Sequence, residues 1–285
     1  MKQSEIVKWK TDGSVVVRKP IPVPEQVEIM KNIYTKFTID TINHDFGNDG
    51  ATTFPCKYNA INKVALDDFF IRAAQELLET YDVMLIQSVA WAKYGEKGNN
   101  SDQRMHMDYG NNSLSHPPPF DSPEVVAFIL YYSDTSIVGG GTRFVPRLPD
   151  KDDRWYRAPY IHMPGQAGIP FENDKNRAEN MLSKRNIHRE ELYRREKCPV
   201  FHVGDVLVYR HDVYHRGTPV KKNCIRYVHN IAYKKRDCTW IYTWTNFAQK
   251  MYYGYMEQFI LTLNPVQLYV LGMEMKNFVR YFPRL

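Results

Sequence analysis

The sequence has few cysteines, no long apolar run and no strong excess of one charge. Its four cysteines among 285 residues have no Cys-X-X-Cys spacing, which argues against a small disulfide framework and favours reduced thiols. No apolar run reaches the about 18 residues that a membrane span needs. The first residues also lack the apolar stretch of a secretory signal. We therefore expect an intracellular, cytoplasmic protein without a membrane span.

The composition indicates a folded protein with a small-molecule partner. The net charge is +6 and the pI about 8.9, but the basic residues are scattered along the chain. Such scattered charge is typical of a solvated surface, so we expect a small-molecule substrate rather than a nucleic acid. The aromatic content of 14% predicts a large core and an aromatic-lined pocket.

Hydrophobic periodicity predicts one domain over 1–285, with helices flanking a mainly β core. In the N-terminal part, about 1–81, it predicts a strand at 14–18 and helices at 24–37 and 65–81. A jelly-roll core follows over about 82–235, and it is interrupted by a charged insertion at about 149–197. Within the core we expect strands at 82–93, 124–132, 142–145 and 225–233, and a hairpin with arms 200–203 and 206–209. Two helices are expected within 242–282.

A histidine and an aspartate two positions apart suggest a metal site. On a strand, His106 and Asp108 would leave the same face, about 6–7 Å apart along the strand axis. Two ligands hold a metal poorly, and the candidate for the third is His215. Two histidines and one carboxylate with open positions are the ligand set of non-haem Fe(II) oxygenases.

Arg226 is a charged residue inside the apolar run 225–228, where burial without a partner is costly. It could form a core salt bridge. Alternatively, its planar guanidinium could bind the carboxylate of a dicarboxylic cosubstrate.

A second interpretation of the histidines uses His211 and His215. Their i, i+4 spacing would bind zinc if the segment were helical. The following Gly217-Thr218-Pro219 does not continue a helix, and the flanking runs are typical of strands. His211 would then be a neighbour of the site or a surface residue.

The chain resembles the phytanoyl-CoA dioxygenase family of Fe(II)- and 2-oxoglutarate-dependent oxygenases over roughly residues 80–275. Four stretches carry the resemblance: the His-X-Asp of 106–108, the glycine-containing region 128–146, the Gly-Asp turn at 204–205 with the distal His215 and Arg226, and the C-terminal stretch 263–272. The resemblance implies a double-stranded β-helix core of the jelly-roll or cupin type.

It also implies how the reaction is arranged. His106, Asp108 and His215 would bind Fe(II), and Arg226 would hold the far carboxylate of 2-oxoglutarate, helped by Thr142 or Tyr131. With O2, 2-oxoglutarate would be converted to succinate and CO2 while an unactivated C–H bond of a small-molecule or lipid-like substrate is hydroxylated. Two alternatives stay open: the same chemistry on a nucleic acid or protein side chain, and a non-catalytic jelly-roll metal-binding protein.

Overall fold

The computed structural model describes residues 1–34, 52–95, 105, 108, 123–148 and 187–238. The expected C-terminal helices within 242–282 and most of the expected insertion at 149–197 lie outside these residues, as does His106. The division of the chain into a single domain with these parts therefore stays a prediction.

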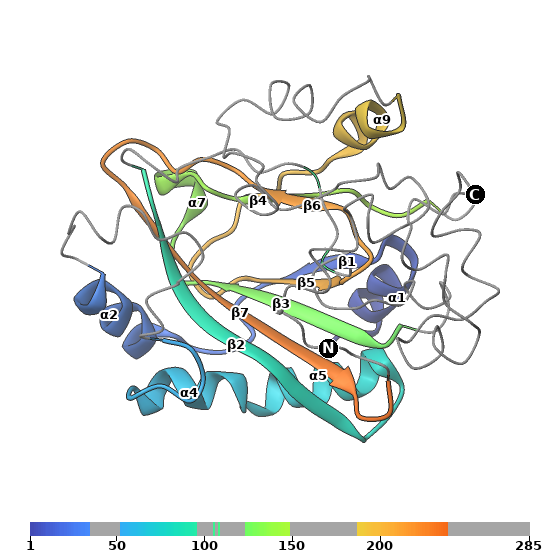
Figure 1. The fold of residues 1–285 in the computed structure, drawn as a ribbon, viewed down its shortest axis with the longest axis horizontal. Helices are drawn as coiled ribbons and strands as arrows, with labels where there is room; N and C mark the ends of the chain where they lie inside the picture. Colours follow the sequence, from blue (N-terminus) through green and yellow to red (C-terminus); the bar gives the residue numbers. More distant parts are fainter. Residues whose placement is uncertain (35–51, 96–104, 106–107, 109–122, 149–186, 239–285) are drawn as a thin grey trace, which may run out of the picture.

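The fold is built from two antiparallel sheets and flanking helices (Figure 1). In chain order the elements are α1 (Gln3–Asp12), β1 (Ser14–Val17), α2 (Pro24–Ile33), α4 (Asn59–Ala65), α5 (Asp68–Leu78), β2 (Val83–Tyr94), β3 (Val125–Tyr131), α7 (Thr135–Val138), β4 (Thr142–Phe144), α9 (Ile187–Arg195), β5 (Val206–Arg210), β6 (His215–Gly217) and β7 (Ile225–Lys235). The predicted fold class, mainly β with flanking helices, is confirmed.

The larger sheet has the strand order β1-β5-β3-β7-β2, and the smaller sheet pairs β4 with β6. β3 lies at the centre of the larger sheet, and all seven of its residues are buried. A strand covered on both faces needs apolar side chains at odd and even positions alike, which explains its continuous apolar sequence. Figure 1 shows α4 and α5 on one side of this sheet and the β4–β6 pair on the other.

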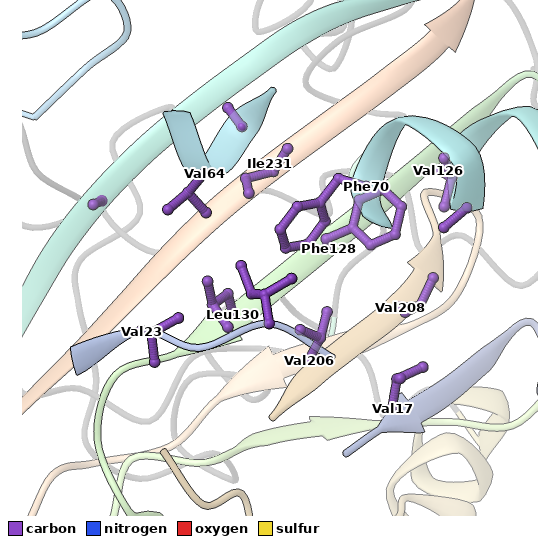
Figure 2. Packing of buried hydrophobic residues seen from close by; sticks show 14 of the residues in the cluster. Val17, Val23, Val64, Phe70, Val126, Phe128, Leu130, Val206, Val208 and Ile231 are labelled. Carbon is purple, nitrogen blue, oxygen red and sulfur yellow. The ribbon is translucent and has the colours of Figure 1, made fainter. Parts of the chain in front are cut away.

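The helix-covered face of the larger sheet holds the main hydrophobic core (Figure 2). Phe70 of α5 meets Phe128 of β3 edge to face, with ring centroids 5.2 Å apart. Asp67 caps the N-terminus of helix α5, and its side chain accepts a hydrogen bond from the Phe69 N–H at 2.8 Å. This capped helix covers one face of the sheet.

The opposite face of the larger sheet packs against the smaller sheet. Its apolar side chains include Trp91, Ile129, Tyr131 and Tyr209, and Phe144 of β4 joins the same cluster. Because side chains alternate along a strand, the neighbours of the helix-facing residues all point into this intersheet layer. Two of the candidate functional residues, Tyr131 and Arg226, lie in it.

Several local predictions were wrong. The expected helix 65–81 is present but shorter, as α5, which starts after the Asp67 cap, whereas α1 and α4 were not predicted. Residues 200–203 form no strand, so the expected hairpin has only its second arm, β5. Instead, Phe201 and Gly204 hydrogen-bond to the backbone around β3: Thr135 N–H donates to Phe201 O, and Gly204 N–H donates to Tyr131 O. None of the helices in the described part of the chain has the length and hydropathy of a membrane span.

Candidate metal centre

A tight turn between β5 and β6 carries the distal histidine. The turn follows Arg210 and contains Asp212, and Val213 N–H donates to Arg210 O at 3.0 Å. The buried Asp212 carboxylate accepts from Arg210 Nε at 2.9 Å and Nη2 at 2.9 Å, and from Arg147 Nη1 at 2.8 Å. Charge-assisted hydrogen bonds of this kind are strong and geometrically specific. We call these three side chains the Asp212 cluster; it fixes the turn that precedes His215.

The N-terminal segment supports the same turn. Arg210 N–H donates to Gly13 O and Arg147 N–H donates to Asp12 O, each at 2.9 Å. The Arg210 guanidinium also lies 5.8 Å from the ring centroid of Trp9, which is fully buried. Gly13 has φ +77°, and a Cβ there would lie 2.5 Å from a Val213 methyl carbon, so only glycine fits this close approach. Residues far apart in sequence thus meet behind the distal histidine.

Asp108 and His215 face each other beyond this turn. His215 Nδ1 lies 3.0 Å from Val213 O, a geometry in which Nδ1–H donates to the carbonyl. That hydrogen bond leaves the lone pair on Nε2, which lies 3.6 Å from Asp108 Oδ1. The Asp108 backbone is held by its own N–H, which donates to His211 O at 3.1 Å. The turn therefore positions both groups through its carbonyl oxygens.

The spacing of these two groups fits a metal ion. Histidine nitrogen and carboxylate oxygen bind divalent metals at about 2.0–2.2 Å, so two ligands of one ion can lie up to about 4 Å apart. The 3.6 Å separation of Asp108 Oδ1 and His215 Nε2 falls within that limit. Asp108 lies in a turn rather than on the strand we expected. Among the described residues, which exclude His106, no three His, Cys, Asp or Glu side chains form a metal-binding group.

His211 lies beside the same carboxylate. Residues 211–215 form a turn leading into β6 and not a helix, so the helical zinc interpretation is wrong in its geometry. The His211 imidazole is buried, and its Nε2 lies 4.0 Å from Asp108 Oδ2. Burial lowers its pKa, against the opposing effect of the Asp108 charge. This position next to the predicted ligands, rather than on the surface, is one that the sequence left open.

Tyr209 also contacts Asp108. Its hydroxyl donates to Asp108 Oδ2 at 2.9 Å. Burial, together with the negative charge and the hydrogen bond of Asp108, raises the pKa of Tyr209 well above its ordinary value. The phenol therefore stays protonated and donates to the carboxylate. We did not predict this contact from the sequence, because Tyr209 and Asp108 are separated by 101 positions.

Arg226 lies buried on the same face of the larger sheet. Its guanidinium donates to Gly140 O and lies 4.7 Å from the ring centroid of Trp91 on β2. Gly140 has φ +72°, and a Cβ there would come within 3.1 Å of the Arg226 Cδ and 2.7 Å of a Val220 methyl carbon. The glycine run thus permits the close backbone approach that holds the guanidinium in place.

Tyr131 and Thr142 lie together next to this arginine. The Tyr131 hydroxyl donates to Thr142 Oγ1 at 2.7 Å, and Thr142 N–H donates back to the Tyr131 oxygen at 3.1 Å. Both side chains are buried. Burial raises the pKa of Tyr131, and the positive charge of Arg226 partly opposes this rise. The three residues that we proposed for the cosubstrate thus share one buried region of the intersheet layer.

Lys93 adds a second cation to this region. It pairs with Arg226 across β2 and β7 and is itself buried, and its Nζ donates to Thr218 O at 3.2 Å. Two cations opposite each other on one buried face repel, and together they create a positive potential that attracts an anion. We did not predict this role for Lys93. The available signal was a lysine near the end of a mostly apolar strand, two positions after Trp91.

Arg143 binds Glu196 and does not join the region around Arg226. It pairs with Arg216 across β4 and β6, and both guanidiniums bind the carboxylate of Glu196 at 2.8–3.0 Å. Burial alone would raise the pKa of Glu196, but the two arginines outweigh it and lower that pKa. Arg143 therefore belongs to the outer face of the smaller sheet, away from Tyr131 and Arg226.

Comparisons with known proteins identify the fold. No protein-family model matches the chain, and no curated protein matches it in sequence. Solved structures do match: the non-haem α-ketoglutarate-dependent epimerase SnoN from nogalamycin biosynthesis has 14% identity and a TM-score of 0.57, covering 86% of this chain and 85% of its own. HygX from Streptomyces hygroscopicus with nickel, 2-oxoglutarate and hygromycin B has 14% identity and a TM-score of 0.53, covering 84% and 89%.

EctD from S. alaskensis, solved with 2-oxoglutarate and 5-hydroxyectoine, has 14% identity and a TM-score of 0.54, covering 82% of this chain and 76% of its own. At this identity the likeness concerns the fold. The double-stranded β-helix core that the resemblance to the phytanoyl-CoA dioxygenase family implies is confirmed.

Proposed function

We propose that this protein is an Fe(II)- and 2-oxoglutarate-dependent oxygenase that hydroxylates an unactivated C–H bond of a small-molecule or lipid-like substrate. The observation that carries the proposal is the approach of Asp108 Oδ1 and His215 Nε2 to 3.6 Å beside Tyr209, in the intersheet layer that also holds the Arg226 guanidinium. Their lone pairs face each other, which suits a shared ion better than a simple ion pair.

In this proposal His106, Asp108 and His215 hold the iron. When bound, iron, 2-oxoglutarate and O2 supply the oxidising power, and 2-oxoglutarate leaves as succinate and CO2. The chain itself fixes the ligands. Val213 O sets the tautomer of His215, and His211 O anchors the backbone of Asp108. Such supporting contacts commonly govern metal affinity.

The far carboxylate of 2-oxoglutarate would bind to Arg226. The guanidinium offers paired donors to a planar carboxylate, and the Tyr131 and Thr142 hydroxyls can supply further hydrogen bonds. Lys93 supports an anion in this position through its charge. The surrounding side chains, including Trp91, Ile129 and Val228, keep water out and so strengthen these interactions.

The structural neighbours support a small-molecule substrate. SnoN was solved with nogalamycin RO, HygX with hygromycin B and EctD with 5-hydroxyectoine, all of them small molecules. By analogy of fold, we favour this class over a nucleic acid or a protein side chain.

Succinate release tests the proposal. The purified protein is incubated with Fe(II), 2-oxoglutarate and O2, with metabolite extract or with short oligonucleotides and peptides. We expect extract-stimulated release in the wild type and none in His215→Ala. His202→Ala serves as a matched control and should be fully active, because this imidazole is half-exposed and pairs with Asp134 instead. Turnover retained by His215→Ala would mean that the ligands are wrong, and release by no mixture would favour the non-catalytic alternative.

A further inference from the structure

Tyr209 contacts three side chains of the candidate metal centre: Asp108, His211 and His215. It lies on β5 with its side chain in the intersheet layer, and only 6% of it is exposed. Its hydroxyl meets Asp108 Oδ2 at 2.9 Å. Its ring lies edge-on to His215, with centroids 4.9 Å apart, and roughly parallel to His211 at 6.1 Å. One side chain therefore links the carboxylate to both imidazoles of the turn.

The hydrogen bond from Tyr209 gives the two oxygens of the Asp108 carboxylate different partners. Oδ2 accepts from Tyr209, while Oδ1 faces His215 Nε2. The Tyr209 hydroxyl thus occupies Oδ2 as a hydrogen-bond donor, and Oδ1 is the oxygen left toward His215. His211 cannot replace it, because its Nε2 lies 4.0 Å from Oδ2, too far for a hydrogen bond.

The backbone of Asp108 has a separate anchor, the hydrogen bond from its N–H to His211 O at 3.1 Å. Rotation of the carboxylate about its side-chain bonds is not restrained by that anchor. The hydrogen bond from the Tyr209 hydroxyl to Oδ2 does restrain it. The backbone position of Asp108 and the orientation of its carboxylate thus depend on different contacts. A substitution at Tyr209 can therefore change the orientation while the backbone stays in place.

We propose that Tyr209 is a positioning residue that restricts Asp108 to one metal-ligating oxygen. Held in this way, the carboxylate takes a single coordination position, and the position that its second oxygen would fill stays available for cosubstrate or O2. This inference rests on the proposed function, since it presupposes a metal between Asp108 and His215. It assigns Tyr209 an effect on metal binding and leaves the chemical step to other groups.

Tyr209→Phe tests the proposal, because it removes the hydroxyl and keeps the ring. Tyr132→Phe is the matched control: its hydroxyl is also buried and lies 3.0 Å from His229 Nδ1, but on the helix-covered face of the sheet. Purified full-length variants are titrated with Co(II), whose visible absorption depends on coordination number and geometry. We expect the dissociation constant to rise about 10–100-fold in Tyr209→Phe, the usual effect of losing a contact that orients a ligand.

The absorption spectrum of Co(II)-loaded Tyr209→Phe should also differ from that of the wild type, whereas Tyr132→Phe should match the wild type in both affinity and spectrum. Equal affinity and an unchanged spectrum in Tyr209→Phe would overturn the proposal. So would failure of Tyr209→Phe to fold when Tyr132→Phe folds, because the hydroxyl would then be structural. If the wild type binds Co(II) no better than His215→Ala does, the metal centre itself is refuted, and the proposed function falls with this inference.

Discussion

Removing the negative charge of Asp212 should destabilise the protein strongly. Asp212→Asn keeps the shape of the side chain but leaves the guanidiniums of Arg147 and Arg210 without the carboxylate that binds both of them. The side chains are 1–5% exposed, so solvent cannot replace that charge. Breaking a buried ion pair by removing one partner typically costs about 3–5 kcal/mol. That is a large part of the about 5–15 kcal/mol by which domains are stable.

The same substitution should weaken metal binding. The Asp212 cluster holds the turn whose carbonyl oxygens accept from Asp108 N–H and His215 Nδ1–H. If the turn loosens, both ligands lose their anchors together. We therefore expect a lower affinity for Co(II) under conditions in which the variant is still folded.

Urea denaturation measures the loss. The midpoint should fall with an unchanged dependence on urea concentration, which would mark a change of stability rather than of compactness. Asp82→Asn is the control, because Asp82 also pairs with an arginine, Arg236, but both side chains are more than half exposed. A surface pair of this kind contributes little, so this variant should unfold like the wild type. A loss below about 1 kcal/mol in Asp212→Asn would refute the reasoning.

Two further predictions concern Arg226 and His229. Arg226→Gln should raise the KM for 2-oxoglutarate by about 30-fold or more, which corresponds to about 2 kcal/mol for a lost buried charge contact. Arg143→Gln is the control, because Arg143 lies on the outer face of the smaller sheet and this KM should stay unchanged. An equal effect of both variants would argue against 2-oxoglutarate binding at Arg226. Burial lowers the pKa of His229 to about 3, so the imidazole stays neutral in the folded protein. Below the ordinary value of about 6.5 the unfolded chain takes up a proton that the folded chain does not, so stability falls as the pH falls, by up to about 1.4 kcal/mol per unit. His229→Gln should show a shallower fall in urea denaturation between pH 7 and 5, and identical slopes would contradict the assignment.

The sequence carried enough information for the sheets and for part of the candidate site. The continuous apolar run at 124–132 and the isolated Arg226 on an apolar strand signal burial directly, and both lie where we expected. The pairing of Asp108 with His215 followed from ligand chemistry rather than from periodicity. These features are local or depend on residue type, which is why a single sequence can reveal them.

What the sequence did not reveal depends on contacts between distant segments. Residues 200–203 have the composition of a strand, but their backbone partners lie beside β3 rather than in a hairpin. The Asp212 cluster unites residues from either side of the insertion. Lys93 and Tyr209 look like ordinary strand residues until the register places Lys93 beside Arg226 and the fold places Tyr209 beside Asp108. The capping Asp67 was a local signal that we missed.

The strand order of the larger sheet affects how the chain folds during its synthesis. In the described sheet every pair of neighbours is widely separated in sequence, and β7 lies between β3 and β2. During synthesis, β2 is therefore made about 140 residues before β7, the strand with which it pairs. The register of Val83 with Lys235 and of Tyr94 with Ile225 shows this separation. Such distant pairing slows folding and leaves apolar strand edges exposed in the meantime. A nascent chain that stops before β7 would hold β1, β5 and β3 without the strand that joins them to β2, and we expect it to bind chaperones.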